Sequence, residues 1–422
     1  MSEAAASVDA ILEGRQIRTL FQPLVHLVDG EVVGFEALSR GPEGSALEDP
    51  LALFAAAEQA GRLVELDWLC AASASRAARR ARLHPSLTVF ANFRPQTLLS
   101  PYPEDDAEDV NRARRQLRIV AEIDENELHH QPADALNAAA HARADGWGVA
   151  LDNMGATPSS LALLPVLHPD VVKLDLRVLA EHQGEDSAEI ETAVRTYAEA
   201  SGAAVLAQRI ETKEDVLSAR AFGATYGQGW RYGRPASLPP KSHVPRAPFQ
   251  LLRASGSESV FTPFEVVHRH RRSSPTEKRM LVRISTVLEH RALSNGASTI
   301  LLGCFQDGRH FSGTTSARYG DLAQRSSFTA IFGAHMADVI LPEIHVPEIH
   351  VPEIHVVDLS PEEALCKEWN VIVVGPNYSG ALVARDLGET GEDRYRRYDH
   401  IVTHDRDLVV EAARSLLRWI GR

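Results

Sequence analysis

The sequence predicts an α/β protein of two domains, an N-terminal (β/α)8 barrel and a C-terminal α/β domain. Over residues 1–238, short apolar strands alternate with alanine-rich helical stretches, and βα units in this number are typical of a barrel. Residues 239–261 are rich in proline and serine, which is typical of a linker. The total of 422 residues is too long for one ordinary domain, so residues 262–422 are expected to form a second one.

The first 238 residues contain the strand candidates on which the barrel prediction depends. They are Leu20–Val28, Glu31–Ala37, Thr88–Asn92, Arg118–Ile123, Val149–Leu151, Val171–Leu174, Ala204–Ala207 and Ala224–Gly227. The first two are joined at Asp29-Gly30, which is a hairpin signal. This hairpin would make one strand pair antiparallel, a departure from the standard parallel barrel.

The second domain is expected to mix helices and strands. Helices are predicted at Ser274–Arg291, Pro361–Trp369 and Asp407–Arg418, and strands at Thr299–Phe305, Asn370–Val374 and His400–Thr403. Within it, residues 341–356 repeat the unit VPEIH with one variation, LPEIH, at the start. Histidine and glutamate can ligate zinc, but a proline at every fifth position forbids a regular helix or a central strand. We favour a tandem duplication that lengthens an exposed loop or edge segment.

The composition excludes several classes of function. The net charge of −13 argues against a general nucleic-acid binder. Cys70, Cys304 and Cys366 lie far apart and in no metal-like spacing, which indicates a reducing compartment without a disulfide framework. The N-terminus lacks a signal-peptide pattern, and no apolar run approaches the roughly 20 residues that span a bilayer. We therefore expect a cytoplasmic protein that does not bind membranes.

Polar residues follow the predicted strands at their carboxyl ends, where the active sites of such barrels lie. They are Glu36, Asn92, Glu122, Asp152 with Asn153, Lys173 with Asp175, Gln208 with Glu211, and Gln228. Lys173 and Asp175 lie on one face of their strand because strand side chains alternate, and burying them is costly unless they are paired or functional. Carboxylates beside an inward lysine are what a metal-assisted phosphodiesterase needs.

These residues carry a resemblance to the EAL domain, the bacterial phosphodiesterase of cyclic di-GMP. The segment Phe35–Arg40, FEALSR, resembles the motif that names the family. Further motifs resemble the family in the same order: Gln22-Pro23, Asn92-Phe93-Arg94-Pro95, Glu122-Ile123-Asp124-Glu125, Lys173-Leu174-Asp175, Ile210-Glu211-Thr212 and Gln228-Gly229. The resemblance covers residues 1–238 and implies a TIM-like barrel of EAL type.

The resemblance also implies a mechanism, in which Mg²⁺ or Mn²⁺ activates a water that opens one phosphodiester to give linear pGpG. By resemblance, the first metal would be held by Glu36, Asn92, Glu122 and Asp152, and the attacking water would be positioned by Lys173, with Glu211 as a further catalytic position. The nucleotide would be bound by Gln22, Arg40 and Gln228, with Asp175 and Glu125 in supporting roles. A homodimer through the EAL domain is also expected.

Two residues depart from the family pattern at the second metal. Asn153 stands where the family has an aspartate, and Gln208 stands where it has a glutamate, so the family's Glu-Gly-Val-Glu has become Gln208-Arg209-Ile210-Glu211. Both are degenerate positions of the site, and we expect one ion rather than two. The prediction is a domain that binds cyclic di-GMP with weak or no hydrolysis. The alternative is an active, metal-dependent cyclic di-GMP phosphodiesterase that is regulated by the second domain.

The second domain resembles the DICT sensory domain. The resemblance rests on Trp369–Pro376, Ala384–Gly388 and His404–Val409. It implies a sensory role in signal transduction for a ligand or protein partner that the sequence does not identify.

Overall fold

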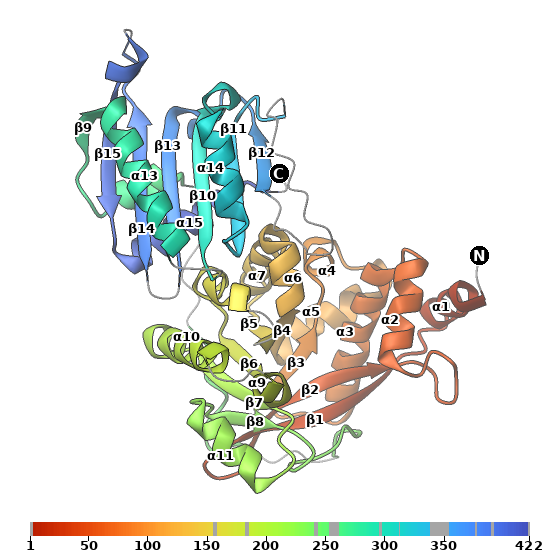
Figure 1. The fold of residues 1–422 in the computed structure, drawn as a ribbon. Helices are drawn as coiled ribbons and strands as arrows, with labels where there is room; N and C mark the ends of the chain where they lie inside the picture. Colours follow the sequence, from red (N-terminus) through yellow and green to blue (C-terminus); the bar gives the residue numbers. More distant parts are fainter. Residues whose placement is uncertain are drawn as a thin grey trace. The chain divides into compact units, whose positions relative to one another are not determined.

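The computed structural model describes residues 3–154, 158–181, 185–239, 244–252, 261–294, 298–311, 313–337, 354–375, 378–389 and 392–420 (Figure 1). The chain divides into two compact units. The first comprises Met1–Leu128, Asn137–Ala156 and His168–Ala254, and the second comprises His129–Leu136, Thr157–Leu167 and Ser255–Arg422.

The first unit contains a closed barrel of eight strands in sequence order. The strands are β1 (Arg18–His26), β2 (Val32–Arg40), β3 (Thr88–Asn92), β4 (Arg118–Asp124), β5 (Gly148–Met154), β6 (Val171–Asp175), β7 (Ala204–Gln208) and β8 (Tyr226–Gln228). β1 is antiparallel to both β2 and β8, and the other neighbours are parallel. The predicted (β/α)8 barrel with one antiparallel strand is therefore confirmed.

One helix precedes β1, and the other helices lie between the later strands of the barrel. They are α1 (Glu3–Glu13), α2 (Pro50–Gln59), α3 (Leu63–Arg80), α4 (Pro95–Leu99), α5 (Glu104–Gln116), α6 (Glu125–His130), α7 (Pro132–Ala144), the 3-10 turn η1 (Pro158–Ala162), α8 (Leu164–Leu167), α9 (Leu176–Glu181), α10 (Glu185–Ser201) and α11 (Lys213–Ala221). Local signals set their starts: Asp49 accepts from Leu51 N and Ala52 N ahead of α2, and Thr212 forms a capping box with Asp215 ahead of α11.

Side chains alternate along each strand between the interior of the barrel and its outer face, so the interior is built of layers. One apolar layer contains Leu24, Val33, Phe90, Val120, Ala150, Val171, Ala204 and Leu206. Two residues further along several of these strands, the same inward face carries a polar side chain, as in Phe90 and Asn92, Val120 and Glu122, or Ala150 and Asp152. The polar layer therefore lies at the carboxyl ends of the parallel strands. The apolar layer of Leu24, Phe90 and their neighbours lies directly beneath it and is called the floor of the barrel below.

A segment that follows β8 completes this floor. Phe249 is fully buried, and its ring lies 5.4 Å from that of Phe90 and 4.2 Å from that of Tyr226. Its carbonyl accepts from Arg118 Nη2 at 2.7 Å, and Leu252 N donates to Asp170 Oδ1 at 2.8 Å. Part of the stretch that we assigned to a linker, residues 239–261, therefore packs into the barrel.

The second unit contains a seven-stranded sheet in the order β12-β11-β10-β13-β14-β15-β9. The strands are β9 (Ser274–Glu277), β10 (Ile300–Asp307), β11 (Phe328–Ala334), β12 (Ile354–Leu359), β13 (Glu368–Val374), β14 (Ser379–Asp386) and β15 (Arg397–Thr403). The helices are α12 (Pro263–His268), α13 (Lys278–Ser294), α14 (Thr314–Ala323) and α15 (Arg406–Leu417), and the 3-10 turns are η2 (Gly308–His310), η3 (Ala364–Lys367) and η4 (Asp393–Tyr395). β10, β11 and β12 are parallel, and the remaining pairs are antiparallel. In Figure 1, α13 and α14 cover one face of this sheet.

Three predicted features of the second domain need correction or qualification. The predicted helix Pro361–Trp369 is wrong, because Glu368 and Trp369 begin β13 and only the short turn η3 precedes it. The predicted helix Ser274–Arg291 begins only at Lys278, since Ser274–Glu277 pairs with β15 as β9. Most of the predicted repeat, residues 341–353, lies outside the described residues, and its last three residues open the edge strand β12.

Candidate metal centre

Three carboxylates from three different strands converge at the carboxyl ends of the barrel strands. Glu36 of β2, Glu122 of β4 and Asp152 of β5 each offer an oxygen atom, and these atoms lie within 4.8 Å of one another. All three side chains are buried. The barrel brings them together because each belongs to the inward face of its strand. Such a group is expensive to bury unless cations compensate its charge.

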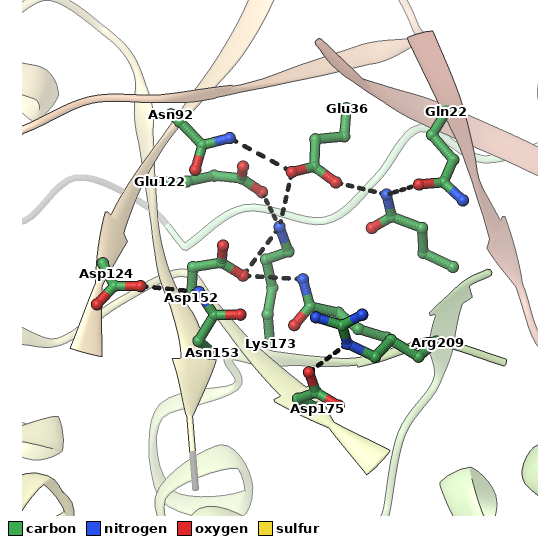
Figure 2. Close-up of polar contacts among 12 residues, drawn as sticks. Gln22, Glu36, Asn92, Glu122, Asp124, Asp152, Asn153, Lys173, Asp175 and Arg209 are labelled. Atoms are coloured by element: carbon green, nitrogen blue, oxygen red, sulfur yellow. Dashed lines mark hydrogen bonds and ion pairs between the residues drawn. The ribbon is translucent and has the colours of Figure 1, made fainter. Parts of the chain in front are cut away.

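Lys173 of β6 provides the first compensating charge. Its Nζ atom lies 3.0 Å from Asp152 Oδ1 and 3.5 Å from Glu36 Oε1, and it forms an ion pair with Glu122 Oε1 (Figure 2). The lysine side chain is fully buried. With every group ionised, the three carboxylates and one ammonium carry a net charge of −2.

The ionisation of the cluster follows from burial and mutual charge. Burial alone would lower the pKa of Lys173, but Asp152, Glu122 and Glu36 outweigh it and raise that pKa, so the ammonium stays charged. Burial and the neighbouring carboxylate of Glu36 raise the pKa of Glu122. Burial likewise raises the pKa of Asp152. Without a further cation, burial and the like charge of Glu36 therefore favour the protonated form of Glu122.

The donor set fits a divalent cation. Glu122 Oε2 and Gln208 Oε1 are buried and accept no hydrogen bond from the described residues. Carboxylate and amide oxygens are the ligands that hard cations such as Mg²⁺ and Mn²⁺ prefer. A single divalent ion would also neutralise the charge of −2. The residues that would hold it are Glu36, Glu122 and Asp152.

A group of amide side chains from β1, β3 and β8 surrounds Glu36 of β2. Gln228 Nε2 donates to Glu36 Oε2 and, at 3.0 Å, to Gln22 Oε1. Gln22 Nε2 donates to the carbonyl of Gly233 at 3.1 Å, and Asn92 Nδ2 donates to Glu36 Oε1 at 3.3 Å. These amides leave an array of donors and acceptors beside the metal position. Arg40, at the end of β2, donates to the adjacent Ser39 carbonyl instead.

Asn153 and Gln208, the two positions that we predicted to be degenerate, both donate hydrogen bonds. Asn153 Nδ2 donates to Asp124 Oδ2 at 2.7 Å, and Gln208 Nε2 donates to Asp152 Oδ1 at 2.9 Å. Asn153 has φ of 58°, a left-handed conformation that asparagine tolerates better than most residues. Each amide is therefore held in place by a hydrogen bond to a carboxylate oxygen, of Asp124 in one case and of Asp152 in the other.

The remaining predicted site residues lie around this centre in different settings. Asp175 is buried and accepts from Arg177 N at 2.9 Å and from Arg209 Nε. Glu125 is fully buried. Glu211 is exposed, and its backbone N–H donates to Asp215 Oδ2 at 2.9 Å. The carboxylate group described above does not include Glu211.

Arg209, for which we predicted no role, lies beside Asp175 at the same end of the barrel (Figure 2). The signal was available in the sequence. Arg209 follows the polar strand end at Gln208 directly and stands where the EAL pattern has a glycine.

The family comparison agrees with the barrel and its site. Residues 5–235, more than half of the chain, match the EAL domain. The chain belongs to the EAL domain family. Residues 259–387 of this EAL protein match the DICT domain, described as "Sensory domain in DIguanylate Cyclases and Two-component system". The predicted order of an EAL domain followed by a DICT sensory domain is confirmed.

Relatives of the EAL protein match over about half of its length. An uncharacterized signaling protein of Caulobacter vibrioides is 29% identical over 223 residues, which is 52% of this chain and 27% of the relative. An uncharacterized protein of Mycobacterium tuberculosis is 28% identical over 245 residues, 54% of this chain and 78% of the relative. The probable cyclic di-GMP phosphodiesterase PdeB of Escherichia coli is 29% identical over 231 residues, 54% of this chain and 44% of the relative.

Among solved structures, Klebsiella pneumoniae BlrP1 in its manganese/cy-diGMP complex matches with a TM-score of 0.45 and 26% identity, over 53% of this chain and 57% of that chain. The PaMucR phosphodiesterase in its c-di-GMP complex matches with a TM-score of 0.48 and 23% identity, over 56% of this chain and 98% of that chain. Separately, no helix in the described part of the EAL protein is both long and apolar enough to cross a membrane.

Proposed function

We propose that this EAL protein is a receptor for cyclic di-GMP that binds the dinucleotide with one Mg²⁺ or Mn²⁺ ion and hydrolyses it weakly or not at all. The EAL and DICT matches and the named phosphodiesterase relative support cyclic di-GMP as the ligand. Glu36, Glu122 and Asp152, with Asn92 hydrogen-bonded to Glu36, would hold the ion. Gln22 and Gln228, which form the amide array beside Glu36, would contact the nucleotide.

One observation carries the assignment of weak hydrolysis. Asn153 and Gln208 are neutral amides whose N–H groups already bind Asp124 and Asp152. A second divalent ion at this position would have to displace both hydrogen bonds and would gain no negative charge from either amide. Two-metal displacement of a phosphodiester needs both ions to stabilise the attacking and leaving oxygens. Loss of one electrostatic element of this kind lowers the rate by about two to three orders of magnitude.

The bound ion would supply Lewis-acid polarisation of a phosphodiester oxygen. The protein's own residues would supply the rest of the recognition. Lys173 would hold a positive charge beside the metal position at every physiological pH, because three carboxylates raise its pKa. The buried position of the cluster excludes bulk water, which strengthens each electrostatic contact to an anionic ligand.

An active phosphodiesterase producing pGpG is the second candidate. The observation that favours it is the complete group of Glu36, Glu122, Asp152 and Lys173, which is more than a passive binding site requires. In that case the DICT domain would regulate the rate. In the receptor, an effector at the DICT domain would instead shift the affinity for cyclic di-GMP, and cyclic di-GMP would shift the effector's affinity by the same factor.

The test uses the purified full chain with cyclic di-GMP and saturating Mg²⁺ or Mn²⁺. Calorimetry measures binding, and chromatography of the products measures pGpG formation. We expect binding at micromolar or lower concentration and a turnover at least ~100-fold below that of an intact EAL enzyme assayed in parallel. The variant Lys173→Met sets the background, because residual hydrolysis by this site must disappear with the lysine. Turnover equal to that of the intact enzyme would exclude the receptor assignment.

A further inference from the structure

Arg209 is held at the end of the barrel that carries the metal centre, on the first residue after β7. Its φ of 62° lies in the left-handed region, where an arginine is unfavourable relative to glycine by roughly 1 kcal/mol. The residues on either side are fixed. Gln208 donates to Asp152, and the fully buried Ile210 donates its N–H to the Gln228 carbonyl at 3.0 Å. Arg209 is therefore held in a left-handed conformation between two neighbours that are fixed by hydrogen bonds.

The Arg209 guanidinium is hydrogen-bonded through Nε, and its side chain is partly exposed to solvent. Its Nε donates to Asp175 Oδ2, while Asp175 is 4% exposed and also accepts from Arg177 N at 2.9 Å. The arginine side chain is 47% exposed. Within the described part of the chain, the guanidinium contacts only Asp175. The N–H groups of its two terminal nitrogens can therefore donate to a ligand.

Its position relative to the metal centre suits an anion. In Figure 2 the guanidinium of Arg209 extends above Asp175 toward the side on which Lys173 lies. The neighbouring strand ends carry the neutral amides of Asn153 and Gln208. One divalent ion would only neutralise the carboxylate cluster, which leaves no excess positive charge for a phosphodiester. A fixed arginine fork binds two phosphate oxygens in parallel and remains charged at every physiological pH.

We propose that Arg209 is a phosphate ligand of this site and contacts a phosphodiester of the bound cyclic dinucleotide. It supplies positive charge at the carboxyl end of β7, beside Gln208, whose neutral amide offers a second cation no negative charge. Asp175 holds the guanidinium in place from behind. This inference rests on the proposed receptor function and adds to it a residue to which the sequence pattern gave no role.

The test compares the affinity of the full chain for cyclic di-GMP with that of Arg209→Gln, by calorimetry in Mn²⁺ and in EDTA. We expect a ~10- to 100-fold loss of affinity in the variant, which is the effect of removing a charged hydrogen-bond pair. Arg82→Gln is the matched control, because Arg82 is also an exposed arginine with left-handed φ, 52°, but lies before β3, at the opposite end of the strand. It should bind as the wild type does.

A second pair of variants separates ligand binding from a purely structural role as the partner of Asp175. Arg209→Lys keeps the charge but loses the fork, and we expect an intermediate affinity. The double variant Asp175→Asn with Arg209→Gln removes both charges. If Arg209 only neutralises Asp175, this double variant should recover wild-type affinity; if Arg209 binds phosphate, affinity should remain low.

The outcomes distinguish the two proposals. Wild-type affinity in Arg209→Gln, or its recovery in the double variant, overturns the role of Arg209 and leaves the receptor function standing. Absence of cyclic di-GMP binding by the wild-type chain overturns both. Thermal unfolding of each variant in the absence of ligand shows that the fold is intact, and the ligand-induced rise in Tm gives an independent measure of affinity.

Discussion

Asn153 and Asp124 are joined by a hydrogen bond of 2.7 Å between the ends of β5 and β4. The bond requires one amide and one carboxylate. Two carboxylates at this distance would repel each other unless a cation lay between them. The same relation holds for Gln208 and Asp152, at 2.9 Å. Both pairs are stable without a second metal, and this makes the reverse substitutions informative.

The double variant Asn153→Asp with Gln208→Glu should convert these contacts into a cation site. In EDTA we expect its free energy of unfolding to fall by about 1–3 kcal/mol, because each change replaces a hydrogen bond with a like-charge contact. Mn²⁺ should restore the loss, and calorimetry should count two bound ions instead of one. Asn111→Asp is the control, since Asn111 accepts from Tyr102 OH at 3.0 Å and an aspartate can do the same. A variant that still binds one ion would contradict this explanation of the site.

Lys173→Met should leave three buried carboxylates without their ammonium. We expect unfolding free energy to fall by about 3–5 kcal/mol in EDTA, the usual cost of removing one partner from a buried ion pair. Added Mn²⁺ should recover part of the loss, because the ion can replace the missing charge. Lys278→Met is the control: Lys278 pairs with Asp393 at 2.5 Å, whose side chain is 61% exposed. Its stability should change little and should not respond to Mn²⁺.

The affinity for the metal should rise with pH. Burial and Glu36 raise the pKa of Glu122, so below that pKa an incoming cation must displace a proton from the cluster. Above the pKa, no proton is displaced and the affinity should level off. Calorimetric titration with Mn²⁺ in buffers of different ionisation enthalpy measures the number of protons released. Release that stays at zero across the acidic range would show that Glu122 is already ionised in the free protein.

Asp67 should make the barrel less stable as the pH rises through about 6. Burial raises its pKa from 3.8 to about 6, against hydrogen bonds from Thr97 Oγ1 and Arg94 N. The folded state therefore keeps a proton that the unfolded chain loses first. The stability due to this group is present below pH 3.8 and is lost as pH passes the folded pKa.

The variant Asp67→Asn should remove this dependence. At pH 8 we expect it to be more stable than wild type by up to about 3 kcal/mol, from a shift of roughly two pKa units, and by about half as much at pH 5. Urea unfolding followed by tryptophan fluorescence measures the difference, and Trp68 is the adjacent residue. Asp105→Asn, at an exposed position, controls for the change in net charge. An equal difference at both pH values would refute the assignment.

Phe249→Ala should show that the segment after β8 belongs to the barrel. The ring is fully buried against Phe90 and Tyr226, so its removal leaves a cavity and should cost about 3–5 kcal/mol. Gln250→Ala, at the exposed neighbour, should have little effect. Comparable stability of the two variants in urea unfolding would mean that the segment contributes nothing to the core.

The barrel could be predicted because its strands and its strand-end residues repeat one pattern. Each inward polar residue lies two positions beyond an apolar one, as Glu122 follows Val120, and the sequence displays this spacing. The convergence of Glu36, Glu122, Asp152 and Lys173 follows once the strands are parallel neighbours. The helix predicted at Pro361–Trp369 was wrong because the local helical preference of PEEALCKEW gave way to pairing of Glu368 and Trp369 with β14.

Other features depend on tertiary contacts that the sequence does not show. β14 contains the segment SGALVARD, whose alanines and glycine carry little strand preference, and it forms through pairing with β13 and β15. The role of residues 247–252 was hidden for the same reason. Proline, serine and glutamine suggested a linker, while the two residues that matter most, Phe249 and Leu251, are only two positions apart. A side chain at Gly148 would meet Leu251 at 2.9 Å, so the floor of the barrel is shaped for this segment.

Residues 247–252 determine where the barrel can be joined to a different sensory domain. A chimera joined at residue 238 would remove Phe249 and Leu251 from the barrel and expose the apolar layer that they close. A chimera joined after Leu252 would keep Phe249 and Leu251 in the barrel and should tolerate a different second domain. The part of the chain that can be moved between proteins is therefore the barrel together with residues 247–252.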